Sequence, residues 1–104
     1  MSNEPLSEQF RIVAKEWVDA DAAASLLEEM KSATLSQQMQ ALGEMPVSKA
    51  EMNVKASQAW ADYIESMTGA RKRANLLKMK LEYLRMRFSE NQSFEATKRA
   101  EMKL

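Results

Sequence analysis

Seven basic side chains crowd one short stretch of the chain, Gly69 to Phe88, which has the sequence GARKRANLLKMKLEYLRMRF. A single acidic residue, Glu82, interrupts them, although the whole chain of 104 residues has a formal net charge of zero. Guanidinium and ammonium groups at this density can bind phosphate or carboxylate groups. The candidate residues for binding a nucleic acid or an acidic partner are Arg71, Lys72, Arg73, Lys78, Lys80, Arg85 and Arg87.

Residues that commonly carry out catalysis or bind metals are scarce. Neither cysteine nor histidine occurs, so the sequence lacks a thiolate nucleophile, the commonest metal ligand and the usual base at neutral pH. Asp19 and Asp21 stand two apart, and on a helix such side chains point to different faces instead of forming a metal-binding pair. We therefore predict that the protein is not an enzyme, binds no metal or cofactor, and has no small-molecule substrate.

The composition favours an all-α fold. The chain contains only two glycines and two prolines, and residues with high helix propensity are abundant. No uninterrupted apolar stretch approaches the roughly 18 residues that a membrane span requires, and the N-terminus lacks the pattern of a secretion signal. We therefore expect a cytoplasmic protein that makes no contact with membranes.

A helix stop and a helix start lie close together in the middle of the chain. Gly43 follows an apolar residue, as the residue after a helix often does, and Pro46 comes three residues later. Ser48 and Glu51 then have the spacing of a capping box, which begins helices. The sequence predicts an antiparallel hairpin with one helix over 7–42, a turn over 43–48 and a second helix over 49–90.

Apolar residues recur at alternating spacings of three and four in both predicted helices, as in coiled coils. In the first helix this stripe consists of Phe10, Val13, Trp17, Ala20, Ala24 and Leu27, and its register breaks at Lys31. In the second helix it consists of Trp60, Tyr63, Met67, Ala70, Ala74, Leu77, Leu81, Leu84 and Phe88. We predict that the two stripes form the seam of the hairpin.

The apolar pattern of the second helix ends at Phe88. Its frame would place Asn91 and Glu95 in the core, and Ser93 is a residue type that often begins a helix. We therefore predict a break after residue 90 and a short third helix over 94–104.

Folding the chain about the predicted turn indicates which residues meet across the hairpin. Trp17 would face Ala74, and Ala20 and Ala24 would face residues 67–70, so that large side chains pack against small ones. The same geometry brings the acidic residues 19 and 21 close to the basic residues 71–73.

The two halves of the chain differ in charge. Residues 1–51 hold nine acidic and four basic residues, a net of minus five, and residues 52–104 hold six acidic and eleven basic residues, a net of plus five. Ion pairs within the hairpin would use part of this charge. The stretch 78–87 would face few acidic residues, which leaves three candidate partners: a nucleic acid, an acidic protein surface, or a second copy of this chain.

Two helices also cannot bury every apolar residue. The apolar residues left outside the seam include Leu26, Ile64, Leu76 and Met86. We therefore expect the hairpin to assemble into a helical dimer or a higher oligomer.

Three segments, WVDADAAASLLEEMKSATLSQ, MPVSKAE and RMRFSENQSFEATKRAEMKL, together resemble small uncharacterised helical proteins of tailed bacteriophages and prophages of Gram-negative bacteria. The resemblance implies a phage accessory protein and brings no catalytic motif. Our first hypothesis is a non-enzymatic protein that acts by helix-mediated protein–protein interaction. The alternative is a nucleic-acid-associated factor in phage recombination or replication that uses the basic stretch 71–87.

Overall fold

Four helices make up the part of the chain that the computed structural model describes, residues 4–102, and no strand occurs in that range. The helices are α1 (Leu6–Glu29), α2 (Lys31–Ala41), α3 (Val47–Lys55) and α4 (Gln58–Met102). They form a narrow rod of 83 × 22 × 18 Å. The predicted all-α class is confirmed.

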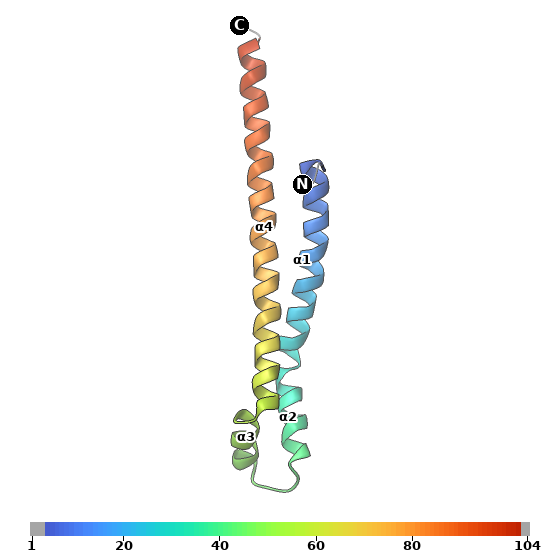
Figure 1. Ribbon diagram of the computed structural model, residues 1–104, viewed down its shortest axis with the longest axis vertical. Helices are drawn as coiled ribbons and strands as arrows, with labels where there is room; N and C mark the ends of the chain where they lie inside the picture. The colour runs from blue at the N-terminus through green and yellow to red at the C-terminus, as the bar shows by residue number, and fades with distance from the viewer. Residues whose placement is uncertain (1–3, 103–104) are drawn as a thin grey trace.

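The rod is built as an antiparallel hairpin (Figure 1). Helix α1 lies along α4 for most of its length, and α2 and α3 form the end of the rod where the chain turns back. Helix α4 is the longest element, with 45 residues, and its C-terminal part extends beyond the start of α1. None of the helices in residues 4–102 has the apolar length needed to cross a membrane.

The turn is set by Gly43 and Pro46. Gly43 has a φ of +84°, and its N–H donates to the carbonyl of Gln40 at 3.1 Å, which ends α2 in the left-handed conformation that glycine adopts at little cost. The predicted capping box at Ser48 is wrong. Pro46 has a φ of −56°, so α3 begins directly after it at Val47, and Ser48 already lies inside the first helical turn with no capping hydrogen bond.

The first predicted helix contains a local distortion at Met30, next to the position where the apolar register breaks. Met30 has φ −84° and ψ 0°, and it separates α1 from α2. The helical hydrogen bonds continue across it, because the N–H of Met30 reaches the carbonyl of Leu26 and the N–H of Thr34 reaches that of Met30. The predicted helix over 7–42 is therefore two helices joined almost in line.

The second predicted helix, over 49–90, is divided at a position where no break was predicted. Helix α3 ends at Lys55, and Ser57 caps the start of α4 because its hydroxyl accepts a hydrogen bond from the N–H of Trp60 at 3.2 Å. The same hydroxyl donates to the carbonyl of Val54 at 2.6 Å. Ser57 thus holds the end of α3 and the start of α4 together.

The predicted break after residue 90 is also wrong. Helix α4 runs through Ser93 to Met102 without interruption, and residues 103 and 104 of the predicted third helix lie outside the described residues. Backbone hydrogen bonds of a helix do not depend on an apolar seam, so Asn91 and Glu95 continue the helix although they contribute nothing to the core. Both side chains are exposed.

The core between α1 and α4 contains two clusters, and Ala50 and Val54 of α3 are buried at the end of the rod where the chain turns back. Near the start of α1, Val13 packs with Leu81 and Leu84, and further along the rod three alanines meet. We call the second cluster the alanine contact; its members are Ala20, Ala24 and Ala74. Ala24 and Ala74 are fully buried, so the two helices approach closely at this point.

The predicted pairing of Trp17 with Ala74 is wrong. Trp17 packs against the cluster of Leu81 and Leu84, and Ala74 instead meets Ala20 and Ala24. Compared with the prediction, α4 is shifted by about one helical turn against α1. We attribute this shift to the break between α3 and α4, which places additional residues at the end of the rod where the chain turns back.

The other predicted seam residues are unevenly buried. Trp60 is buried and stacks on Tyr63 with the ring centroids 5.7 Å apart, while the Tyr63 hydroxyl donates to the carbonyl of Leu27. The half-buried members are Phe10, Trp17, Leu27, Tyr63, Met67, Ala70 and Leu77. Phe88, at the end of the seam, is 48% exposed because α1 begins beside it and leaves one side uncovered.

Candidate binding face of helix α4

The seven predicted basic residues differ in their surroundings, and Arg71 is set apart from the rest. Its guanidinium binds the carboxylate of Asp21 at 2.7 Å and that of Glu28 at 2.8 Å, and it also donates to the hydroxyl of Ser25 at 3.2 Å. The Arg71 side chain is only 30% exposed. This residue therefore ties α4 to α1.

The electrostatics around Arg71 support this structural role. Hydrogen bonds from Arg71 hold the pKa of Glu28 below its ordinary value of 4.5, with a further contribution from the positive charge. The hydrogen bonds to Glu28 and then to Asp21 raise the pKa of Arg71. The predicted proximity of Asp21 to Arg71 is found, whereas Asp19 and Arg73 are exposed and no ion pair joins them.

The other six basic residues keep their charge on the surface. Each is exposed, and none forms an ion pair with an acidic residue of the described part of the chain. They are Lys72, Arg73, Lys78, Lys80, Arg85 and Arg87. The structure therefore divides the predicted basic stretch into one cation used inside the hairpin and six that remain available for binding.

A second apolar stripe runs along α4 on the side away from α1. It consists of Leu76, Met79, Tyr83 and Met86, which are 58%, 66%, 55% and 58% exposed. Their spacing of three, four and three places them on one face of the helix. At 3.6 residues per turn this face lies roughly 160° around α4 from the seam. We call these four residues the outer stripe.

Basic residues border the outer stripe. Arg73, Lys80 and Arg87 recur every seven residues and form a row that lies roughly 80° around the helix from the stripe and equally far from the seam. Lys72 extends the line of the stripe toward α3. We call the outer stripe together with Lys72, Arg73, Lys80 and Arg87 the outer face of α4. Its centre is apolar and one of its borders is cationic, while Glu82 lies on the opposite border.

A hollow of about 180 Å³ is bordered by Lys80 of the outer face together with Glu4 and Glu16. Two further hollows lie along α4. One, of about 410 Å³, is bordered by Arg71, Leu76 and Met79 and so opens beside the outer stripe. The other, of about 300 Å³, lies where α1 begins and is lined mainly by Phe10, Leu84 and other apolar residues. Neither contains a cluster suited to metal binding, because the described residues include no group of three or more acidic side chains close enough to hold an ion.

Sequence reasoning found the members of the outer stripe only in part. It placed Leu76 and Met86 among the apolar residues left outside the seam, but did not join them to Met79 and Tyr83. The signal was present, since the four residues repeat the spacing of the seam residues Ala74, Leu77, Leu81 and Leu84 two positions further along the chain. Comparison with known proteins found no matching family model, no matching curated protein and no similar solved structure.

Proposed function

We propose that this chain is a non-enzymatic accessory protein, in a phage or prophage setting, that acts by binding helices of other protein chains on the outer face of α4. The observation that carries the proposal is the outer stripe, four large apolar side chains that are each more than half exposed on one continuous helix face. Contiguous apolar patches with a polar rim are typical of protein interaction sites. The phage setting is supported by the resemblance of the three sequence segments alone.

The chemistry of the outer face indicates which helix would bind there. A partner with apolar residues at spacings of three and four would pack into the stripe as a further helix of a coiled coil. Fully burying side chains of this size contributes about 1.5–3 kcal/mol each, and roughly half of that area is still exposed here. Carboxylates beside the partner's apolar residues would meet Arg73, Lys80 and Arg87.

A nucleic-acid-associated role is the second candidate, and the six exposed cations favour it. They are spread around α4, however, so that Lys78 and Arg85 lie on the other side of the seam from Lys80 and Arg87. A phosphate backbone lying along the rod would meet one of these rows and leave the outer stripe in water. A protein helix uses both the stripe and its rim, so we prefer the protein partner.

The test measures binding of a labelled synthetic helix by fluorescence anisotropy. The probe is a peptide with leucines at spacings of three and four and glutamates beside them, compared with a counterpart that carries lysines in place of glutamates and with a labelled 20-base-pair DNA duplex. We expect the acidic peptide to bind at 150 mM salt and the basic peptide to bind at least tenfold more weakly. The reason is that charges of the same sign at an interface disfavour association.

Matched variants assign the binding to the outer face. Lys80→Glu with Arg87→Glu should weaken binding of the acidic peptide at least tenfold, whereas Lys98→Glu with Arg99→Glu changes the charge equally but lies in the last turns of α4 and should leave it unchanged. DNA binding that falls steeply with salt, combined with no binding of the acidic peptide, would contradict the proposal and favour the nucleic-acid role.

A further inference from the structure

The opposite edge of the rod carries an apolar stripe as well. Val18 and Leu26 of α1 are each 56% exposed and Met30 is 44% exposed, and Ala22 lies between the first two at the same spacing of four. By helical geometry this line faces roughly 170° away from the seam of α1. We call Val18, Ala22 and Leu26, together with Met30 directly after the end of α1, the outer stripe of α1.

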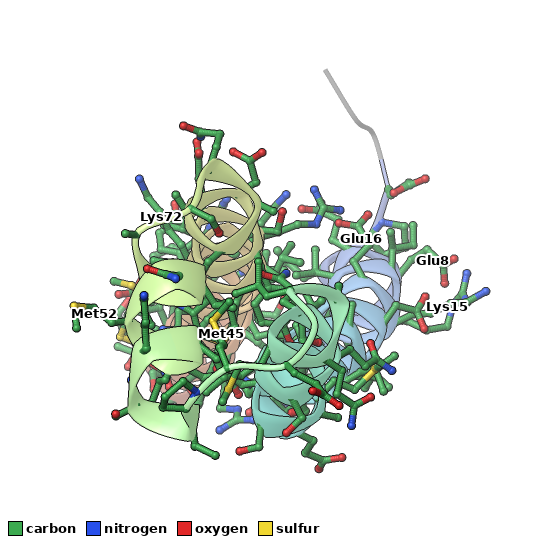
Figure 2. All side chains as sticks on the ribbon, turned by 90° about the horizontal axis from the view of Figure 1, so that it is seen from below. Glu8, Lys15, Glu16, Met45, Met52 and Lys72 are labelled. Carbon is green, nitrogen blue, oxygen red and sulfur yellow. The ribbon has the colours of Figure 1, made fainter. Side chains whose placement is uncertain are left out.

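The two outer stripes lie on opposite edges of the molecule. Figure 2, which views the rod along its length, shows Lys72 of α4 projecting from one edge and Glu8 and Lys15 of α1 projecting from the other. A single copy therefore cannot bring its own two outer stripes together.

The charge available beside the outer stripe of α1 is mainly negative. Asp21 and Glu28 of α1 are already bound to Arg71. The remaining charged residues of the stretch 15–30 are exposed and form no ion pair within the described chain; they are Lys15, Glu16, Asp19 and Glu29. Asp19 and Glu29 lie within about 40° of this stripe and Lys15 lies in line with it, whereas Glu16 lies nearer the seam beside Lys80. The available charge at this edge is therefore net negative, and one border of the outer face of α4 is basic.

We propose that the partner bound by the outer face of α4 is a second copy of this chain, which presents the outer stripe of its α1. This inference rests on the proposed function and names its partner. The lengths agree, because Leu76 to Met86 spans about 15 Å and Val18 to Met30 about 18 Å at 1.5 Å per residue. Apolar surface meets apolar surface, and acidic flanks meet basic ones.

Pairing of two α4 helices through the same face fits less well. Residues 72–90 hold six basic residues, at 72, 73, 78, 80, 85 and 87, and two acidic ones, at 82 and 90, a net of plus four. A symmetric contact would set this charge against itself, which is unfavourable. An anionic lipid surface would suit the outer face of α4 but would leave the outer stripe of α1 uncovered. Only the second copy accounts for both exposed stripes.

The proposed contact joins two different surfaces, so each copy keeps one unused edge after binding. Such head-to-tail contacts close into a ring or continue as an open chain. The mass of the assembly should therefore rise with protein concentration beyond that of a dimer. High salt should weaken association through the charged rims without abolishing the apolar contribution.

The test uses two variants, each blocked on one edge. Met79→Glu with Lys80→Glu blocks the outer face of α4, and Val18→Lys with Leu26→Lys blocks the outer stripe of α1. All four positions are exposed, so both variants should keep the helicity of the natural chain by circular dichroism. The masses of the natural chain, of each variant and of an equimolar mixture are measured by light scattering over a hundredfold range of concentration.

We expect each variant alone to be monomeric and the mixture to form a one-to-one dimer, which has twice the mass of either variant, because each supplies the edge that the other lacks. A mixture that stays monomeric while the natural chain forms a closed dimer would overturn the head-to-tail contact in favour of pairing through one face. A natural chain that is monomeric at every concentration would overturn self-association altogether.

In the monomeric case two further measurements separate the remaining occupants. Binding of the acidic peptide to a monomeric chain would leave the proposed function standing with a different partner protein. Sedimentation of the monomeric chain with vesicles of phosphatidylserine and phosphatidylcholine, lost in the Met79→Glu, Lys80→Glu variant, would identify a lipid surface and overturn this inference.

Discussion

The two apolar faces of α4 have the same residue spacing and opposite surroundings. On the face toward α1, Ala74 is fully buried and Leu81 and Leu84 are 8% and 5% exposed, whereas on the outer face Leu76 and Met79 are 58% and 66% exposed. The periodicity alone does not distinguish them. What differs is the partner, because α1 can cover only one side of α4. The outer face of α4 therefore has the residue pattern of a coiled-coil seam, but no second helix packs on it.

The difference in burial predicts the largest stability effect. Leu84→Ala removes a side chain that packs with Val13 and Leu81, and we expect it to lower the free energy of unfolding by about 2–5 kcal/mol. Leu76→Ala makes the same chemical change on the outer face and should cost no more than about 0.5 kcal/mol. Urea denaturation at a protein concentration low enough to keep the chain monomeric measures both. Equal losses for the two variants would show that α1 does not pack on this side of α4.

Replacing a small residue by a large one should also affect the buried face of α4 more than its exposed face. Ala74→Leu would force a larger side chain between α1 and α4, and we expect a loss of about 1–3 kcal/mol. Ala61→Leu places the same side chain at an exposed position of α4 and should stay within about 0.5 kcal/mol of the natural chain. Both values come from urea denaturation. A neutral Ala74→Leu would mean that the helices do not approach closely at this point.

The sequence predicted the helical hairpin because its strongest signals are local. Gly43 adopts the left-handed conformation that ends α2, and the chain turns back after it. The sequence did not predict that Ser57 caps a new helix, since serine occurs in many places and its capping role depends on the carbonyl and N–H groups that surround it. That break shifts the register, which is why Ala74 meets alanines and not Trp17.

The candidate site was predicted in part for a similar reason. The run of basic residues is visible in the sequence, but only the structure separates Arg71, which binds Asp21 and Glu28, from the exposed cations. Periodicity gives the faces of a helix without indicating which of them a partner covers. The C-terminal part of α4 was also predicted wrongly, because the helix continues where the apolar pattern stops.

Substitution by alanine should change the stability in opposite directions at the two glycines, because one lies in the turn and the other inside α4. At Gly43, where φ is +84°, substitution by alanine should destabilise the hairpin by about 1 kcal/mol, because a side chain disfavours the left-handed conformation. Gly69 lies inside α4 with open space around it, so Gly69→Ala should instead stabilise by about 0.5–1 kcal/mol. Thermal unfolding followed by circular dichroism gives the two signs. Stabilisation by both substitutions would contradict the turn at Gly43.

The smallest effect concerns the ion pairs of Arg71. Because the folded chain lowers the pKa of Glu28 below 4.5, the stability that this group contributes is present above pH 4.5 and is lost as the pH falls through the lowered pKa. The gap in urea midpoint between the natural chain and Arg71→Gln should therefore be larger at pH 7 than at pH 3. The control Arg73→Gln changes an exposed arginine that forms no ion pair, so its gap should not depend on pH. A constant gap for Arg71→Gln would mean that Glu28 gains nothing from Arg71.

The most direct measurement of the outer face of α4 as a binding surface is the labelling rate of a single thiol placed on it. The chain has no cysteine, so Met79→Cys and the control Met52→Cys on α3, another exposed methionine, each provide a unique site. We predict that saturating acidic peptide slows labelling at position 79 at least fivefold and leaves position 52 unchanged. Equal labelling rates at position 79 with and without the bound peptide would contradict the account.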